Sequence, residues 1–258
     1  MHIVVALRLV PDLSGDIELT ADGKDIDREW IDIKLNEFDE HALEEAIILK
    51  ERHGAKVTAI AIATDGADRL LQGALARGAD DAVKISCDLH EALSPRDAAH
   101  IFAGATRDLE ADLFLTGVQT PEDTFGQLAP FVGAILDWPC VSAVSSIRAG
   151  DADVTVTQEL SGGASAILRM KTPAVVGAQA ASQPVRYVAG SKLRESASRK
   201  IRSLEGNAGA ASEVSELLSV SLPDSAGGAV MLDGDAQTIA GSLQRLLVER
   251  GLLKGSGS

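Results

Sequence analysis

The chain has 258 residues, of which 45% are apolar and only 3% aromatic, and it carries a net charge of −14. This length suits one sizeable α/β domain with extensions or two small domains, and the aliphatic composition favours parallel strands in a layered fold. The acidity argues against nucleic acid and anionic membranes as partners. No apolar run reaches the ~18 residues that span a bilayer, so we expect no membrane insertion.

The beginning of the chain and its cysteines predict where the protein works. The apolar stretch Ile3–Leu7 starts almost at once, without a charged region or a cleavage signal for export. Cys87 and Cys140 form no CxxC pair and are expected to be reduced thiols. We therefore expect a cytoplasmic protein. Residues 255–258 resemble a linker scar and are expected to take no part in the fold.

Up to residue 136, apolar runs of strand length alternate with segments of helical period. Strands are predicted at 2–10, 56–63, 81–86 and 111–116, and helices at 37–53, 67–77, from Ser94 onward and at 126–136. This alternation predicts a parallel sheet with helices on both faces. Between the first strand and the first helix, residues 16–27 have the turn signal of a hairpin. In helix 37–53, Glu44 and Glu45 are expected to lie largely away from the apolar face.

After residue 139 the pattern changes to short alternating strands. They are predicted at 141–148, 153–159 and 164–170, with one more buried strand at 172–178. Residues 1–180 are thus expected to form an α/β domain with an antiparallel extension. Residues 181–235 lose their periodicity and suit an extended arm that lies on another subunit. Residues 236–254 contain an amphipathic helix, with Leu243 and Leu246 on its apolar face, that we expect to dock on a partner.

Ligands of such sheets bind in the crevice beyond the carboxyl ends of the strands, here formed by loops 10–15, 63–67 and 117–126. The sequence has no GxGxxG, no GxxxxGK(S/T) and no nucleophile elbow, so a phosphate would be held by backbone amides and small polar groups. The segment Gly117–Gln127 fits this role, although on composition an ordinary connecting loop fits as well. No catalytic set of serine, histidine and acid emerges from the spacing, which indicates a binder rather than an enzyme.

Several segments in collinear order, among them Asn36-Glu37-Phe38-Asp39-Glu40 and Val5-Ala6-Leu7-Arg8, resemble those of electron transfer flavoprotein beta subunits. Residues 36–46 are similar to the N-P-F-D-E-x-A-x-E-E-A signature of that family, and they follow residues 5–12, which are similar to its V-A-x-(K/R)-x-V-x-D opening. Further matches follow in the family's order at 74–80, 112–117, 126–127, 137–139, 159–176 and 184–187. The collinear order extends the resemblance over nearly the whole chain to about residue 190, and it reappears in the terminal helix.

The resemblance implies a three-layer fold of the adenine nucleotide alpha hydrolase-like type and a heterodimer that shuttles electrons from a flavin-dependent dehydrogenase to an acceptor. A larger alpha subunit would hold most of a redox-active FAD, while this chain would supply a wall beside the flavin and carry AMP in its crevice. By position, the AMP contacts would be Ala6, Asn36, Glu37, Phe38, Asp39, Ile62, Gly117, Val118, Gln119, Thr120, Asp123, Thr124, Phe125, Gly126 and Gln127. Leu13 and Phe38 would lie near the flavin ring.

Departures from the family pattern leave two alternatives open. Loop 117–127 is shorter than the family's D-D-D-x-N-Q-T-G-Q loop, Leu13 replaces a tyrosine, and residues 188–194 lack the usual Leu-Pro of the partner-recognition loop. One alternative is a bifurcating member, with a second FAD in place of AMP and with NADH as donor. The other is a stand-alone nucleotide-binding regulator, which leaves the arm and the terminal helix unexplained.

Overall fold

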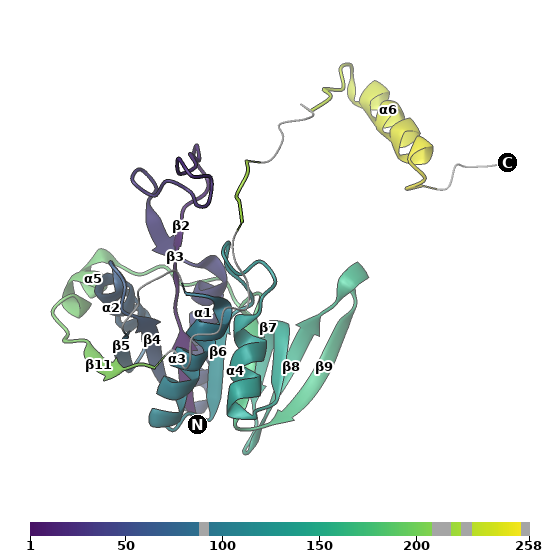
Figure 1. The fold of residues 1–258 in the computed structure, drawn as a ribbon. Coiled ribbons are helices and arrows are strands. Elements are labelled where there is room, and N and C mark those ends of the chain that lie inside the picture. Colours follow the sequence, from purple (N-terminus) through teal and green to yellow (C-terminus); the bar gives the residue numbers. More distant parts are fainter. Residues whose placement is uncertain (88–92, 208–217, 223–228, 254–258) are drawn as a thin grey trace.

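A computed structural model describes residues 1–87, 93–207, 218–222 and 229–253. Within these residues the centre is a nine-stranded sheet with the strand order β11-β5-β4-β1-β6-β10-β7-β8-β9 (Figure 1). Its parallel part contains β1 (His2–Ala6), β4 (Lys56–Ile62), β5 (Asp81–Ser86), β6 (Leu113–Gly117) and β10 (Ala174–Ala178). The helices that cover it are α1 (Glu37–His53), α2 (Ala67–Arg77), α3 (Pro95–Asp108) and α4 (Leu128–Leu136).

Alternate residues of β1 face opposite sides of the sheet, and each side has its own apolar core. Ile3 and Val5 belong to the core that contains the buried residues of α1 and α2, whereas Val4 and Ala6 belong to the core of α3 and α4. All four side chains are fully buried, as expected for a central parallel strand. The two cores confirm the predicted α/β fold with a helical layer on each face of a mostly parallel sheet.

The antiparallel extension continues the sheet beyond β10. β7 (Cys140–Ala149) pairs in parallel with β10 and antiparallel with β8 (Asp153–Glu159), which in turn pairs with β9 (Ser165–Lys171). The turn between β8 and β9 contains the short 3-10 helix η1 (Ser161–Gly163). The three antiparallel strands predicted from alternation are thus confirmed, with nearly the predicted bounds.

The single strand predicted over residues 2–10 is wrong, because the chain leaves the sheet after β1. The amide of Leu7 still donates to the carbonyl of Ile60 at 2.8 Å. The amide of Arg8, however, donates to the carboxylate of Asp39 at 2.9 Å, so a side chain of α1 takes the place of a neighbouring strand. The apolar pattern of residues 2–10 does not show that the strand ends here, because Leu7 before Arg8 and Val10 after it are both buried.

After this break, residues 9–35 form a segment, here called the excursion, that projects from the sheet (Figure 1). β2 (Leu9–Pro11) pairs antiparallel with β3 (Ile33–Leu35) in a separate two-stranded sheet. The hairpin predicted at residues 16–27 is present but short, with an antiparallel bridge between Leu19 and Ile26. On either side of this bridge, the amide of Thr20 donates to the carbonyl of Asp25 at 2.9 Å, and the amide of Asp27 donates to the carbonyl of Glu18 at 2.8 Å.

Part of the predicted arm is built into this subunit instead of extending away from it. α5 (Gly190–Ser196) packs against α2, and β11 (Arg202–Glu205) pairs in parallel with β5 at the edge of the sheet. The terminal helix α6 (Ala236–Glu249) differs, because none of its residues is buried and it lies apart from the body (Figure 1). Residues 208–217 and 223–228 of the predicted arm, and the predicted linker scar at 255–258, lie outside the described residues.

Glu44 and Glu45, expected to lie largely away from the apolar face of α1, are nevertheless buried, at 3% and 1% exposed. The carboxylate of Glu45 accepts hydrogen bonds from the amides of Ile147 and Ser182, each at 2.8 Å. Glu44 is paired with Arg186. α1 is therefore covered on two sides, by the sheet and by residues 181–187, and its acidic residues fix the covering segment through hydrogen bonds.

Candidate functional site

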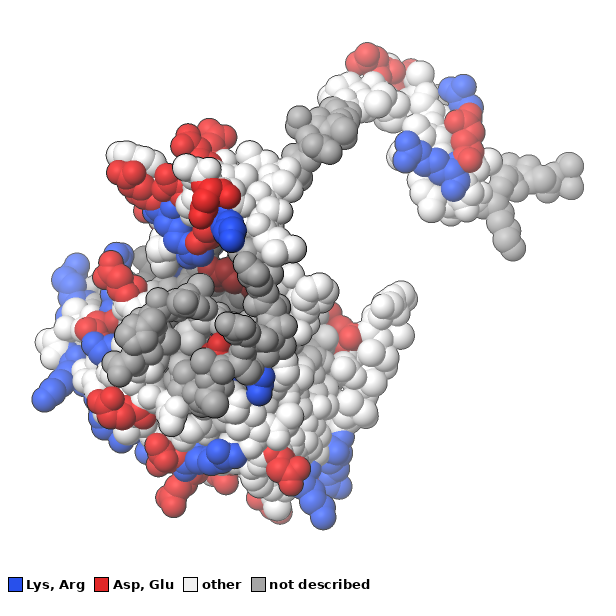
Figure 2. Space-filling view, in the orientation of Figure 1, with Lys and Arg blue, Asp and Glu red and all other residues white. Residues whose placement is uncertain are grey.

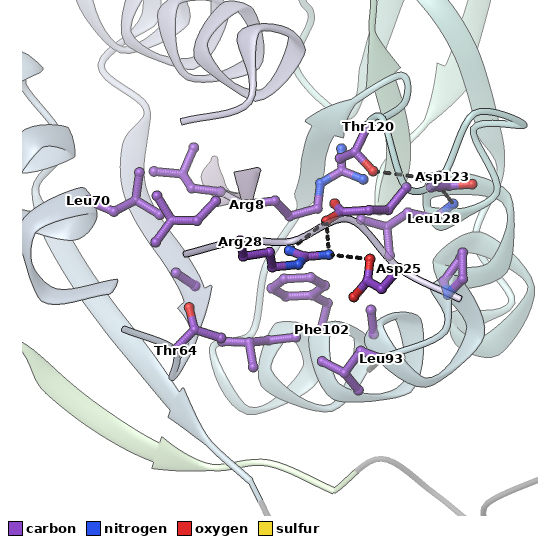
Figure 3. Close-up of a pocket in the computed structure, with 17 residues that line it drawn as sticks. Arg8, Asp25, Arg28, Thr64, Leu70, Leu93, Phe102, Thr120, Asp123 and Leu128 are labelled. Carbon is purple, nitrogen blue, oxygen red and sulfur yellow. Dashed lines mark hydrogen bonds and ion pairs between the residues drawn. The ribbon is translucent and has the colours of Figure 1, made fainter. Parts of the chain in front are cut away.

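A cavity of about 500 Å³ lies beyond the carboxyl ends of β1 and β4 (Figure 3). Its floor and sides include Ile62 at the end of β4, Phe102 of α3 and Thr120 of the loop after β6. Arg28, from the excursion, also lines it. The volume and the mixture of apolar walls with a few polar groups are typical of small-molecule sites, and the position agrees with the general placement of ligands in parallel sheets.

A second hollow of about 310 Å³ adjoins the cavity and shares Thr120 with it. Leu13 of the excursion and Phe38 of α1 contribute its apolar wall. Leu13 is 39% exposed and Phe38 is half-buried, so this wall faces outward rather than into the core. The hollow is therefore suited to the flat face of a ligand that another molecule holds.

The predicted contact residues are divided between these two spaces. Ile62, Thr120 and Asp123 line the cavity. The residues that line the hollow are Leu13, Asn36, Glu37, Phe38, Gln119, Thr120 and Thr124. The other predicted residues line neither space: Ala6, Asp39, Gly117, Val118, Phe125, Gly126 and Gln127. Among these, Ala6 is fully buried, whereas Phe125 is 89% exposed.

Asp39 holds the ends of two strands together and does not face the cavity. It is fully buried and accepts hydrogen bonds from the backbone amide of Arg8 at 2.9 Å and from that of Gly117 at 2.6 Å. The guanidinium of Arg8 donates to both carboxylate oxygens, at 2.7 and 2.9 Å. The carboxylate is thus committed to the ends of β1 and β6, and any ligand contact from this residue would come from its backbone.

Gly117 is required by the same arrangement. A Cβ atom at this position would lie 2.5 Å from the carbonyl carbon of Phe38 and 2.6 Å from the amide nitrogen of Asp39. Side chains do not approach backbone atoms so closely, so only glycine lets β6 end against the start of α1. This close approach brings loop 117–127 beside Asn36, whose side-chain amide donates to the carbonyl of Gln119 at 2.9 Å.

The start of α4, predicted to offer its amides to a phosphate, is capped by a side chain of the loop itself. The carboxylate of Asp123 accepts from the amide of Gln127 at 2.9 Å and from that of Leu128 at 3.1 Å. Asp123 is 6% exposed, and its own amide donates to the hydroxyl of Thr120 at 2.9 Å. A carboxylate therefore occupies the favourable field at this helix terminus, where an anionic ligand was expected.

The cavity also contains residues that the sequence did not indicate. Arg8 lines it while it holds Asp39, and Asp25 and Arg28 reach it from the excursion. Arg28 pairs with Glu122 of loop 117–127 at 3.3 Å, across 94 positions of the chain. Arg28 belongs to no recognisable motif, and only the folding of the excursion over the cavity brings it to Glu122. In the part of the chain that the structure describes, no cluster of His, Cys, Asp or Glu is placed to hold a metal ion.

These features define an α/β protein with a ligand cavity at the carboxyl edge of a parallel sheet. Residues 25–208 match the model of the electron transfer flavoprotein domain. The chain is 32% identical over 190 residues to an electron transfer flavoprotein subunit beta of Bacillus subtilis, covering 72% of each chain. It is 26% identical over 261 residues to the subunit beta of Methylophilus methylotrophus, covering 96% of this chain and 98% of that one, and 29% identical over 204 residues to that of Homo sapiens, covering 78% and 80%.

The chain therefore belongs to the electron transfer flavoprotein beta subunit family. Members of this family are generally electron carriers rather than enzymes. Among residues 1–87, 93–207, 218–222 and 229–253, no helix is both long and apolar enough to cross a membrane.

Proposed function

We propose that this chain is the beta subunit of a heterodimeric electron transfer flavoprotein, which accepts electrons from a flavin-dependent dehydrogenase and passes them to an acceptor. The electrons are carried by an FAD held mainly by the alpha subunit, and this chain turns over no substrate of its own. The observation that carries the proposal is the family match over residues 25–208. The heterodimer is proposed to work in the cytoplasm.

The outward-facing hollow supports the proposed role beside the flavin. FAD supplies the redox chemistry when it is bound, and the protein's part is to shield the ring and tune its potential. Leu13 and Phe38 offer an apolar surface there, and Lys34 and Asp12 form an ion pair of 2.9 Å at the same hollow. These residues fit the face of a flavin whose remaining contacts come from a partner.

The cavity supports a second, structural nucleotide, which we propose to be AMP. Thr64 and Thr120 offer hydroxyl groups, Ile62 and Phe102 offer apolar contact for a base, and Arg28 offers a positive charge. The proposed contacts from loop 117–127 are its remaining backbone groups, since Asp123 already holds the amides of Gln127 and Leu128. Asn36 and Ala6 are proposed to act by shaping the floor between the cavity and the hollow.

A bifurcating protein, with a second FAD in the cavity and NADH as donor, is the alternative function. The observation that favours it is that Thr120 lines both the cavity and the hollow, so the two spaces are neighbours, and we propose that a ligand longer than a mononucleotide occupies both. The number of flavins in each heterodimer distinguishes the two functions.

The terminal helix supports the proposed heterodimer. Leu243, Leu246 and Val248 are 47%, 36% and 37% exposed, and a helix with an uncovered apolar face is unstable alone in water. We propose that α6 lies on the alpha subunit in a permanent contact. We propose that residues 188–194, which include the start of α5 and the 43% exposed Leu193, meet the dehydrogenase in a weak and transient one.

Co-expression with an alpha subunit tests the proposal. The two chains are expected to purify as a stable one-to-one complex that contains FAD, and L243D combined with L246D is expected to abolish the complex. Q237D combined with Q244D, which adds the same two charges at exposed polar positions of α6, is the matched control and should leave the complex intact. A stable, flavin-free monomer of this chain in the presence of the alpha subunit would contradict the proposal.

A further inference from the structure

Two arginines line the cavity, and they are held in different ways. Arg8 is 14% exposed in its side chain, and its guanidinium donates to Asp39 and to the carbonyl of Gly117 at 3.0 Å, so its position is fixed. Arg28 is 45% exposed and pairs with Asp25 at 3.6 Å and with Glu122 at 3.3 Å. Exposed pairs of this kind contribute little to stability, so Arg28 can exchange a carboxylate for another anion at small cost.

The position of Arg28 places this exchangeable charge inside the ligand site. Figure 3 shows Arg28 among the lining side chains, ion-paired with Asp25. Its second partner, Glu122, belongs to loop 117–127, so the Arg28–Glu122 pair joins the excursion to that loop. Figure 2 shows acidic and basic side chains gathered side by side on the excursion. An anion that enters the cavity thus meets a guanidinium that is already held by carboxylates.

Other donors at the cavity are largely committed to the protein. α4 is capped by Asp123, and α3 is capped by Ser94, whose hydroxyl accepts from the amide of Asp97 at 3.1 Å. Pro95, in the first turn of α3, has no N–H to offer. The start of α2 at Gly66 has no side-chain cap, but a helix terminus carries only a partial charge. Among the described residues that line the cavity, Arg28 is therefore the full positive charge with replaceable partners.

The carboxylates limit how much negative charge the cavity can accept. Asp25, Glu122 and Asp123 line it together with two arginines, so acidic groups outnumber basic ones before any ligand enters. Once a phosphate takes Arg28, the carboxylate of Glu122 loses its partner and lies close to the ligand. Each additional phosphate charge is then repelled over a short distance.

We propose that Arg28 binds the phosphate of the ligand in this cavity, and that Glu122 competes with the ligand for it. The cavity then selects a nucleotide with a single phosphate group over a triphosphate. This inference rests on the proposed function, since it takes the ligand to be an adenine nucleotide. It adds that Arg28 binds the phosphate and that Glu122 limits how many phosphate charges the cavity accepts.

Calorimetric titration of the nucleotide-freed full-length chain with AMP, ATP and inorganic phosphate tests the inference. R28Q is expected to weaken AMP binding at least about tenfold, whereas R28K, which keeps the charge, should retain most of the affinity. E122Q is expected to strengthen AMP binding by about threefold and to reduce the preference for AMP over ATP. Inorganic phosphate alone should bind far more weakly than AMP, because it lacks the apolar contacts of the base.

R202Q is the matched control, because Arg202 pairs with Asp81 at 3.2 Å and with similar exposure, but lies outside the cavity. It should leave AMP affinity unchanged, and near-ultraviolet circular dichroism should show that all variants are folded. Equal AMP affinity of R28Q and the unchanged chain would overturn the inference and leave the proposed function standing. So would an E122Q variant weakened as much as R28Q, since the ion pair would then only order the loops. If the unchanged chain binds no nucleotide, the inference and the nucleotide part of the proposed function both fail, while the heterodimer test remains independent.

Discussion

Arg186 and Glu44 are joined by hydrogen bonds of 2.8 and 3.0 Å, although 142 positions separate them in the chain. Glu44 is buried in α1, and Arg186 also reaches the exposed Glu51 at 2.7 Å. The two carboxylates raise the pKa of Arg186 well above its usual value, chiefly through the hydrogen bonds that Arg186 donates to Glu44. The pair therefore fastens residues 181–187 to α1, and these residues lead to α5.

Loss of the ion pair between Arg186 and the buried Glu44 is expected to destabilise the protein more than loss of the pair between Arg186 and the exposed Glu51. R186Q leaves the buried carboxylate of Glu44 unpaired, which should lower the free energy of unfolding by about 3 kcal/mol. E51Q removes only the exposed partner and should cost less than ~1 kcal/mol. Urea unfolding of both variants measures the difference, and hydrogen exchange of residues 181–187 should rise only in R186Q. If R186Q and E51Q lowered the free energy of unfolding equally, the ion pair with the buried Glu44 would contribute no more to stability than the ion pair with the exposed Glu51.

Asp39 is expected to be a structural residue of the site. D39N removes the charge that holds Arg8 and weakens the bonds to the ends of β1 and β6, so the free energy of unfolding should fall by about 3–5 kcal/mol. E37Q, at an exposed neighbour in the same helical turn, should change it by less than ~0.5 kcal/mol. Thermal and urea unfolding provide the measurement. A D39N variant as stable as the unchanged chain would mean that the carboxylate is available to a ligand after all.

Removal of the cap on α4 is expected to have a smaller effect. D123A deprives the amides of Gln127 and Leu128 of their acceptor, and loss of such a cap typically costs about 1 kcal/mol. D123N, which keeps one acceptor oxygen, should recover most of that loss. Urea unfolding of the two variants gives the comparison, and an alanine variant with full stability would show that solvent replaces the cap without cost.

The pH dependence of stability is expected to include a contribution from His2. Burial lowers its pKa below the usual 6.5, and its ring nitrogens contact the carbonyl of Leu109 and the hydroxyl of Thr58. Because the unfolded chain binds this proton more readily, the contribution is full above pH 6.5 and is lost as the pH falls through the native pKa.

Urea unfolding at about pH 7.5 and about pH 5.5 should show a loss of stability at the lower pH that is smaller in H2Q. Acidic residues titrate in both proteins, so the difference between the two isolates the imidazole. An identical pH dependence of H2Q and the unchanged chain would contradict the role assigned to His2.

The spacing of apolar residues predicted most of the fold, because most helices and strands have a pattern that is contained within their own residues. The alternation of β8 and the helical period of α2 are complete within a dozen residues, and their bounds, Asp153–Glu159 and Ala67–Arg77, are as predicted. β11 could not be predicted in this way, since its four residues form a strand only because β5 leaves an edge to pair with. The amphipathic pattern of α6 alone does not show whether its apolar face packs on this subunit or on a partner, because the pattern is the same in both cases.

The site was predicted less well, for a related physical reason. Asp39 and Asp123 stand at positions where a ligand contact is expected, but long-range hydrogen bonds commit both carboxylates to the protein. Arg28 lies outside every motif and enters the cavity through the path of the excursion. Spacing along the chain carries no information on such contacts, which depend on how two distant loops meet.

The cofactor content of the purified heterodimer tests most directly whether this chain is the nucleotide-carrying half of a flavin housing. Absorbance and mass spectrometry of the released nucleotides should find one FAD and one AMP per heterodimer. Two FAD would assign the protein to the bifurcating alternative. A heterodimer with a single FAD and no second adenine nucleotide would contradict the role proposed for the cavity.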